Sequence, residues 1–181
     1  RSYRVAPIGF DWKPRKIAKN QAFLDDLKLP FEPRDYQLDG FHHALSYKKS
    51  LLVSPTASGK SLIIYLIVRA LNVKTLIIVP TTSLVSQLFS DFQEYGWDSA
   101  KYCHQVYAGQ DKVSDKQVVI STWQSIYKLN KKTFEPYRLV IGDEAHGFKS
   151  KSLTTLMTKC VNAEYGIGTT GTLDGACEIT C

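Results

Sequence analysis

Short apolar runs recur along the chain, and polar or small residues follow each of them. The clearest is TLIIV at residues 75–79, whose β-branched residues are typical of a strand covered on both faces. Runs of this kind predict strands at residues 51–53, 75–79, 118–121, 139–141 and 165–168, and around Val106.

Segments with apolar positions at helical spacing lie between these runs. They predict helices at residues 36–45, 62–68, 122–127 and 152–160, and one that runs from a cap at Thr82 or Ser83 to about residue 95. Strands that alternate with helices indicate an α/β fold, with a parallel sheet and helices on both of its faces.

Ligands of such a sheet bind beyond the carboxyl ends of the strands, so chemistry is expected in the segments at those ends. These segments are SPTASGKS (54–61), PTTSLVSQ (80–87), STWQS (121–125), DEAH (143–146) and TTGT (169–172).

The first segment has the form of a phosphate-binding loop between a strand and a helix. Gly59 lets the backbone approach a phosphate, Lys60 offsets phosphate charge, and the Ser61 hydroxyl suits a magnesium ion. The N-terminus of the next helix adds unpaired N–H groups and the positive end of a dipole. Ser54 replaces the first glycine of the usual pattern, so a chance Gly-Lys-Ser at a helix start is the alternative.

DEAH follows a predicted strand, where nucleotide hydrolases hold the magnesium ion that neutralises the γ-phosphate. Asp143 is therefore the candidate on the magnesium side, and Glu144 is placed to polarise an attacking water as general base. An acidic loop at a strand end is the alternative. The phosphate loop earlier in the chain makes that alternative much weaker.

Composition limits the classes of protein that fit. A chain of 181 residues suits one domain, which should bury about 70% of its unfolded surface. No apolar run approaches the roughly 20 residues of a membrane helix. The net charge of +6 and the pI near 9.1 favour a polyanionic partner.

The cysteines predict free thiols in a reducing compartment, and hence a cytoplasmic protein, in the host cytoplasm if the protein is viral. They form no CxxC pair, which argues against a zinc site. They are Cys103, Cys160, Cys177 and Cys181.

Residues 1–30 differ from the rest of the chain. Before residue 20 they hold six basic residues against one acid, Asp11, with Tyr3, Phe10 and Trp12 interleaved. Such a segment either contacts nucleic acid or connects to an upstream domain, and the two alternatives are equally supported. Prolines at 30 and 33 place the start of the main domain near Phe31.

The motifs together resemble one family. PTxSGKS, VPTTSLVSQ, STWQS, DEAH and TGT, in this order, are similar to those of the first RecA-like motor domain of superfamily 2 helicases and translocases, of the DEAH-box type. EPRDYQ at residues 32–37 strengthens the likeness, in the style of phage recombination helicases. The resemblance implies a RecA-like P-loop domain at 31–173 and the start of an interdomain linker at 174–181.

The resemblance implies an ATP site and a coupling segment. Gln37 would contact the adenine edge, although a polar helix start is the alternative for this residue. His146 would connect the nucleotide site to the coupling segment. The ATP-binding residues implied are Arg34, Tyr36, Gln37, Pro55, Thr56, Ala57, Ser58, Gly59, Lys60 and Ser61; the catalytic residues are Lys60, Asp143, Glu144 and His146; the magnesium ligands are Ser61 and Asp143; the coupling residues are Thr170, Gly171 and Thr172.

The resemblance also implies a nucleic-acid contact, through hydroxyl, amide and backbone groups that bind phosphates without regard to sequence. For two of its residues there are alternatives, because Thr82 can cap a helix and Trp123 can pack in the core. The residues are Pro80, Thr81, Thr82, Thr122, Trp123 and Gln124.

The expected function is that of an ATP-dependent DNA helicase or translocase motor that acts on branched or hybrid nucleic acid. Its expected cofactors are ATP and Mg²⁺. Besides DNA, the alternatives for its partner are RNA and an RNA–DNA hybrid. A second RecA-like domain with an arginine finger is expected outside this chain, so the fragment alone should hydrolyse ATP poorly. The alternatives are a restriction-type double-stranded DNA translocase and a nucleotide switch that does not translocate. Glu144 argues against the switch, because a passive binder needs no acid that activates water.

Overall fold

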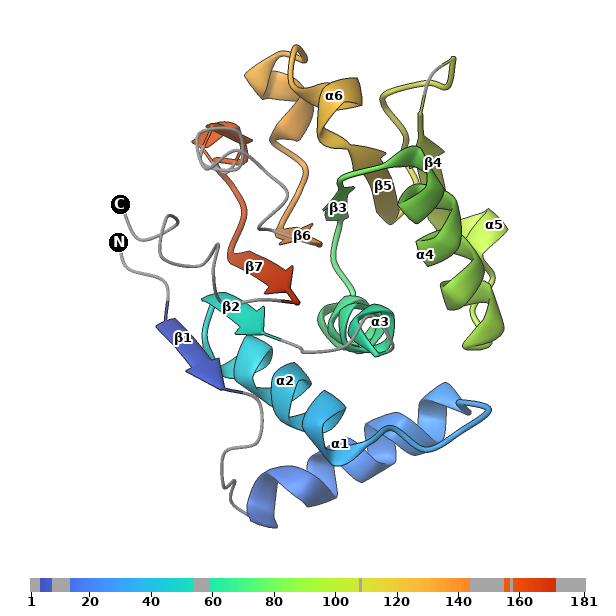
Figure 1. Cartoon of the computed structure of the whole chain (residues 1–181), viewed down its shortest axis with the longest axis vertical. Coiled ribbons are helices and arrows are strands. Elements are labelled where there is room, and N and C mark those ends of the chain that lie inside the picture. Colours follow the sequence, from blue (N-terminus) through green and yellow to red (C-terminus); the bar gives the residue numbers. More distant parts are fainter. Residues whose placement is uncertain are drawn as a thin grey trace.

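A parallel sheet forms the centre of the molecule (Figure 1). This computed structural model describes residues 4–7, 14–53, 59–107, 109–143, 155–156 and 158–171. Within those residues the sheet has seven strands in the order β1-β2-β7-β6-β3-β5-β4. The strands are β1 (Arg4–Pro7), β2 (Lys49–Val53), β3 (Thr75–Val79), β4 (Cys103–Val106), β5 (Val118–Thr122), β6 (Leu139–Gly142) and β7 (Tyr165–Thr170).

Helices cover both faces of the sheet, with α2 and α3 on one side of the strands and α6 on the other in Figure 1. The helices are α1 (Pro14–Leu27), α2 (Asp35–Ser46), α3 (Lys60–Leu71), α4 (Thr82–Glu94), α5 (Ser99–Tyr102) and α6 (Trp123–Ile126), with the 3₁₀ helix η1 (Lys131–Phe134). Residues 155–156 and 158–159 are also helical. The predicted parallel α/β fold is confirmed.

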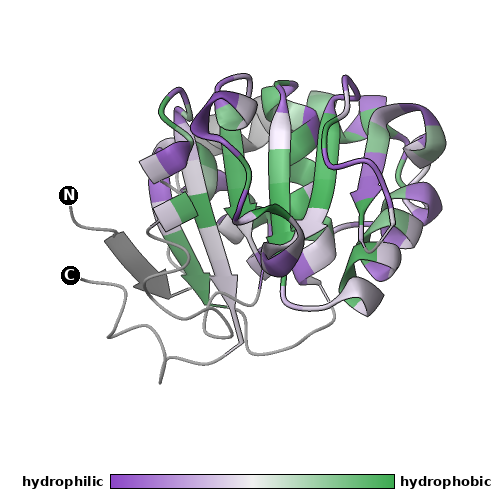
Figure 2. Ribbon diagram, turned by 90° about the horizontal axis from the view of Figure 1, so that it is seen from above, coloured by the Kyte–Doolittle hydropathy of each residue, from purple (hydrophilic) through white to green (hydrophobic). Residues whose placement is uncertain are grey.

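Strand β3 shows why its sequence is apolar without a break. All of its residues are buried, and successive side chains point to opposite faces. Ile77 and Val79 belong to the core beneath α2, α3 and α4, whereas Leu76 and Ile78 belong to the core beneath α6 and η1. Figure 2 shows hydrophobic residues concentrated along the strands and hydrophilic ones in the connections.

The N-terminal elements were not predicted. The sequence analysis placed no helix or strand before residue 31, but β1 pairs with β2 and α1 packs on the core. Phe23 stacks on Phe41 of α2 with ring centroids 5.7 Å apart, and Leu27 is 8% exposed. The basic charge of this segment concealed the apolar spacing of Phe23, Leu24 and Leu27, which is that of a helix face.

The cap of α4 corrects another prediction. The N-cap is Thr81, whose Oγ1 accepts a hydrogen bond from the Leu84 backbone N–H at 3.3 Å. The predicted caps, Thr82 and Ser83, lie inside the helix instead. Both candidates lie in a run of hydroxyl residues, and the backbone dihedrals decide which of them caps the helix.

No helix in the described part of the chain is both long and apolar enough to cross a membrane.

Candidate active site and nucleic-acid groove

The carboxyl ends of β6 and β7 bring Asp143 next to a threonine that the sequence analysis did not select. Gly142 is paired with Gly168, so the residues that follow them, Asp143 and Thr169, lie side by side. Thr169 Oγ1 donates a hydrogen bond of 2.6 Å to Asp143 Oδ1. Thr169 is 1% exposed, so this buried hydroxyl orients the predicted magnesium-side carboxylate. The signal in the sequence was a second threonine directly before Thr170.

Lys60 lies at the start of α3 and is only 5% exposed. Burial lowers the pKa of its ammonium group, and the negative charge of Asp143 partly offsets that effect. The structure therefore brings together the predicted phosphate-binding lysine and the predicted magnesium-side acid, which are far apart in the sequence.

Gly59 allows the backbone to pass close to α2. Its φ is +130°, and a Cβ at this position would lie 2.7 Å from both Tyr36 Oη and Gln37 Nε2. Only glycine is compatible with both the dihedral and the contact. The contact with α2 is a second reason for the glycine, beside the predicted approach to a phosphate.

Gln37 joins α2 to the phosphate loop. Its side chain is 6% exposed. The Oε1 atom accepts a hydrogen bond of 2.8 Å from the Arg34 backbone N–H, and Nε2 lies 3.5 Å from the Gly59 carbonyl oxygen as a weak donor. Gln37 therefore stabilises the start of α2, which is the alternative role considered for it in the sequence. It also contacts the phosphate loop at Gly59.

A pocket of about 550 Å³ lies beside these residues. It collects four of the predicted ATP-binding residues, Arg34, Gln37, Gly59 and Ser61, together with Phe31, Glu32, Leu62, Gln87, Asp91 and Tyr95. Its volume lies within the range of small-molecule sites. Tyr36 is next to this pocket through its contact with Gly59 but does not line it.

Ser61, the predicted magnesium ligand, already has a partner. Its Oγ lies 2.7 Å from Oη of Tyr95, the residue that ends α4. Burial raises the pKa of the Tyr95 phenol, so the phenol is neutral at neutral pH. The sequence analysis used Tyr95 only to mark the end of a helix.

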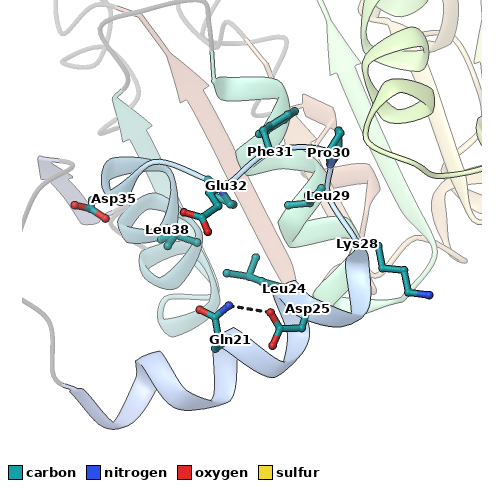
Figure 3. A pocket seen from close by; sticks show the side chains of 11 residues that line it. Gln21, Leu24, Asp25, Lys28, Leu29, Pro30, Phe31, Glu32, Asp35 and Leu38 are labelled. Atoms are coloured by element: carbon teal, nitrogen blue, oxygen red, sulfur yellow. Dashed lines mark hydrogen bonds between the residues drawn. The ribbon is translucent and has the colours of Figure 1, made fainter.

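A second hollow of about 650 Å³ lies between α1 and the loop before α2 (Figure 3). It shares Phe31 and Glu32 with the pocket described above. Asp25, Glu32 and Asp35 outnumber the one cation in its lining, Lys28. Among the described residues that line it, none is a predicted ATP-binding residue, so this hollow is not the candidate nucleotide site.

A groove of about 610 Å³ lies at the carboxyl ends of β3 and β5. It brings together all but one of the predicted nucleic-acid contacts: Pro80, Thr81, Thr82, Thr122 and Gln124. Tyr107, Gly109, Lys112 and Ser125 complete the lining, and the sequence analysis did not select them. Thr122 Oγ1 and Ser125 Oγ lie 2.8 Å apart, which holds the two hydroxyls together.

Trp123 does not line this groove. Its ring lies 5.8 Å from that of Tyr127 and packs against the core beneath α6. The packing role considered for Trp123 is therefore the one that the geometry favours: Trp123 begins α6 and packs on the core, whereas Gln124 and Ser125 of the same helix line the groove.

Thr170 is the last residue of β7, and Gly171 follows it. Thr170 is paired with Val53, the last residue of β2 before that loop. The remaining predicted site residues lie outside the described residues: Pro55, Thr56, Ala57, Ser58, Glu144, His146 and Thr172.

Two of the cysteines, Cys103 and Cys160, are free and buried. Burial raises the pKa of both thiols to about 12, so they are unreactive at neutral pH. The predicted cytoplasmic location stays a prediction.

Comparison with known proteins agrees with this geometry. The ATP-dependent DNA helicase uvsW of Enterobacteria phage T4 is 34% identical over 157 residues, which are 82% of this chain and 31% of that protein. The DNA 3'-5' translocase XPB2 of Sulfurisphaera tokodaii is 28% identical over 164 residues, which are 87% of this chain and 36% of that protein. The chain thus spans about a third of the length of these relatives.

Solved structures share the fold. The crystal structure of the UvsW helicase from bacteriophage T4 matches with a TM-score of 0.80 and 30% identity, over 91% of this chain and 63% of that one. A Sulfolobus solfataricus SWI2/SNF2 ATPase core in complex with dsDNA matches with a TM-score of 0.65 and 18% identity, over 84% and 36% of the two chains. At that identity the second match shows the fold alone.

The family of the type III restriction enzyme res subunit, ResIII, matches residues 30–175. That range contains every motif from Gln37 to Thr170. The fold is that of a RecA-like helicase domain, and the chain belongs to the ResIII helicase family.

Proposed function

We propose that this chain is the first motor domain of an ATP-dependent DNA helicase or translocase that remodels branched or hybrid nucleic acid. The observation that carries the proposal is that two sets of motif residues assemble into two separate hollows at one edge of the sheet. The pocket beside Gly59 and Gln37 suits a nucleotide, and the groove at Thr82 and Thr122 suits a strand. A motor needs both, because hydrolysis at one must act on the polymer held by the other.

The nucleotide site has the donor set that Mg·ATP requires. Lys60 would bind the β- and γ-phosphates, while the Ser61 hydroxyl and the Asp143 carboxylate are the oxygen ligands that suit Mg²⁺. Thr169 fits this use, because its hydrogen bond orients the Asp143 carboxylate. When bound, magnesium supplies neutralisation of phosphate charge. Glu144 would take the proton of the attacking water, and His146 would connect the site to Thr170 and Thr172.

The groove supplies contacts that suit a polymer with a uniform backbone. Hydroxyl groups of Thr82 and Ser125 and the amide of Gln124 can bind phosphates of any sequence, and Lys112 adds a positive charge. DNA is the proposed partner because the relatives above are named as a DNA helicase and a DNA translocase. RNA and RNA–DNA hybrids suit the same contacts. A second RecA-like domain would supply the arginine finger.

A second candidate is a restriction-type double-stranded DNA translocase. The matching family favours this candidate, because its description names the res subunit of type III restriction enzymes. The two candidates use the same motor and differ in the substrate that the whole protein acts on.

The proposal is tested by ATP hydrolysis in the full-length protein, with no nucleic acid and with single-stranded, double-stranded and branched DNA. We expect stimulation by DNA, and a loss of turnover on the order of 1000-fold in Lys60→Ala, because phosphate stabilisation is removed. Lys132→Ala, an exposed lysine outside both hollows, is the matched control and should keep full turnover. Undiminished turnover in Lys60→Ala, or hydrolysis indifferent to every nucleic acid, would contradict the proposal. Preference for branched over linear DNA separates the first candidate from the second.

A further inference from the structure

Tyr95 links the end of α4 to the first turn of α3. The two helices pack against each other (Figure 1), and the oxygens of Tyr95 and Ser61 lie 2.7 Å apart although the residues are 34 positions apart in the chain. Either oxygen can be the donor of this hydrogen bond. Tyr95 also lines the nucleotide pocket.

The position of the Tyr95 ring is determined by its neighbours. The ring is 9% exposed and meets the edge of Phe31 at 5.7 Å with an interplanar angle of 80°. On another side it packs against Tyr65 at 5.2 Å. A ring held by aromatic neighbours keeps its hydroxyl in one place, and no loop has to become ordered to bring it there.

The chemistry of a hydroxyl ligand explains what this contact can do. A serine hydroxyl has one proton and two lone pairs, and it binds a cation through a lone pair. Its proton must then point to an acceptor on the side away from the cation. If the Ser61 proton is directed to Tyr95 Oη, the Ser61 lone pairs remain for the cation.

We propose that Tyr95 is a positioning residue: its Oη accepts a hydrogen bond from the Ser61 hydroxyl and so orients that hydroxyl toward the magnesium ion of the bound nucleotide. This inference rests on the proposed function, in which Ser61 is a magnesium ligand. Partners that orient metal ligands in this way strongly affect metal affinity in other sites.

The test uses Tyr95→Phe in the full-length protein, because phenylalanine keeps the ring packing and removes only the hydroxyl. The affinity for a fluorescent ADP is measured with Mg²⁺ and with EDTA. In Mg²⁺ the variant should bind the ADP about 3- to 10-fold more weakly than the natural protein, because one orienting hydrogen bond is lost. In EDTA the variant and the natural protein should bind it equally well. The control is Tyr102→Phe, which removes a hydroxyl from a ring stacked on Trp97 in the same core and should leave both affinities unchanged.

A double-mutant cycle tests whether Tyr95 acts through the Ser61 hydroxyl or only through its packing. In a Ser61→Ala background, Tyr95→Phe should have no further effect on Mg-dependent binding, because the hydroxyl it orients is gone. Equal losses with Mg²⁺ and EDTA, independent losses in the cycle, or no loss at all would overturn the inference and leave the proposed function standing. Binding by the natural protein that is indifferent to Mg²⁺ would overturn both.

Discussion

The nucleotide pocket and the strand groove lie at the same edge of the sheet but are built differently. Around the nucleotide site, Gln37 of the pocket and the neighbouring Lys60 and Thr169 are almost completely buried, and hydrogen bonds place Gln37 and Thr169. In the groove, Thr82, Gln124 and Lys112 are exposed. A site for chemistry must hold its groups within fractions of an ångström, whereas a surface that moves along a polymer needs weak contacts that are easily released.

Helix α4 connects the two regions. It begins directly after Pro80 and Thr81 in the groove and ends at Tyr95 in the pocket. Since it spans 13 residues, the helix is about 20 Å long, so the groove and the pocket lie about one helix length apart.

After Lys60→Ala, the largest effect is expected from Gly59→Ala. The new Cβ would displace the Tyr36 hydroxyl and the Gln37 amide, and the dihedral strain should cost about 1–3 kcal/mol of stability. We expect hydrolysis to fall on the order of 100-fold, because the phosphate loop is moved from its place. Turnover and the melting temperature are the measurements.

Gly96→Ala is the matched control for Gly59→Ala. Gly96 also has a positive φ, +95°, but a Cβ there meets no atom within 4 Å. It should therefore lower the melting temperature through backbone strain alone and keep full turnover per folded molecule. If both variants lost turnover equally, the close contact of Gly59 with α2 would not explain the effect of Gly59→Ala.

Thr169→Val should have an intermediate effect. Valine has nearly the same shape but cannot donate to Asp143, so we expect turnover to fall about 10-fold, as when a partner of a metal ligand is lost. The control is Thr75→Val, which removes a buried hydroxyl bonded to the Val73 carbonyl, away from the pocket. Thr75→Val should affect stability but not turnover per folded molecule. Normal turnover in Thr169→Val would show that Asp143 is placed by its backbone alone.

The smallest effect is expected in the groove. Lys112→Ala should weaken DNA binding moderately and reduce the slope of log affinity against log salt by about 1, because one phosphate contact is lost. Nucleotide affinity in the absence of DNA should not change. Lys131→Ala, on η1 and outside the groove, is the control. An unchanged salt slope in Lys112→Ala would remove this lysine from the strand contact.

Most elements were predictable because their signals are local. The run TLIIV marks β3 to the residue, and the apolar spacing from Tyr36 to Leu45 marks α2 within one residue at each end. The same local patterns concealed α1, where charge dominated, and could not select Thr81 from a run of hydroxyl residues as the cap. Trp123 follows the groove residue Thr122 directly, so its sequence position did not reveal that it packs in the core.

The sequence by itself determined the buried strands, the motif residues at their ends and the family to which they belong, because each is a pattern of neighbouring residues. Only the tertiary structure decided which ends meet. Strand β7 lies between β2 and β6, which places Thr169 at Asp143, and the packing of α4 on α3 places Tyr95 at Ser61. Such contacts depend on strand order and helix packing, and no local pattern records them.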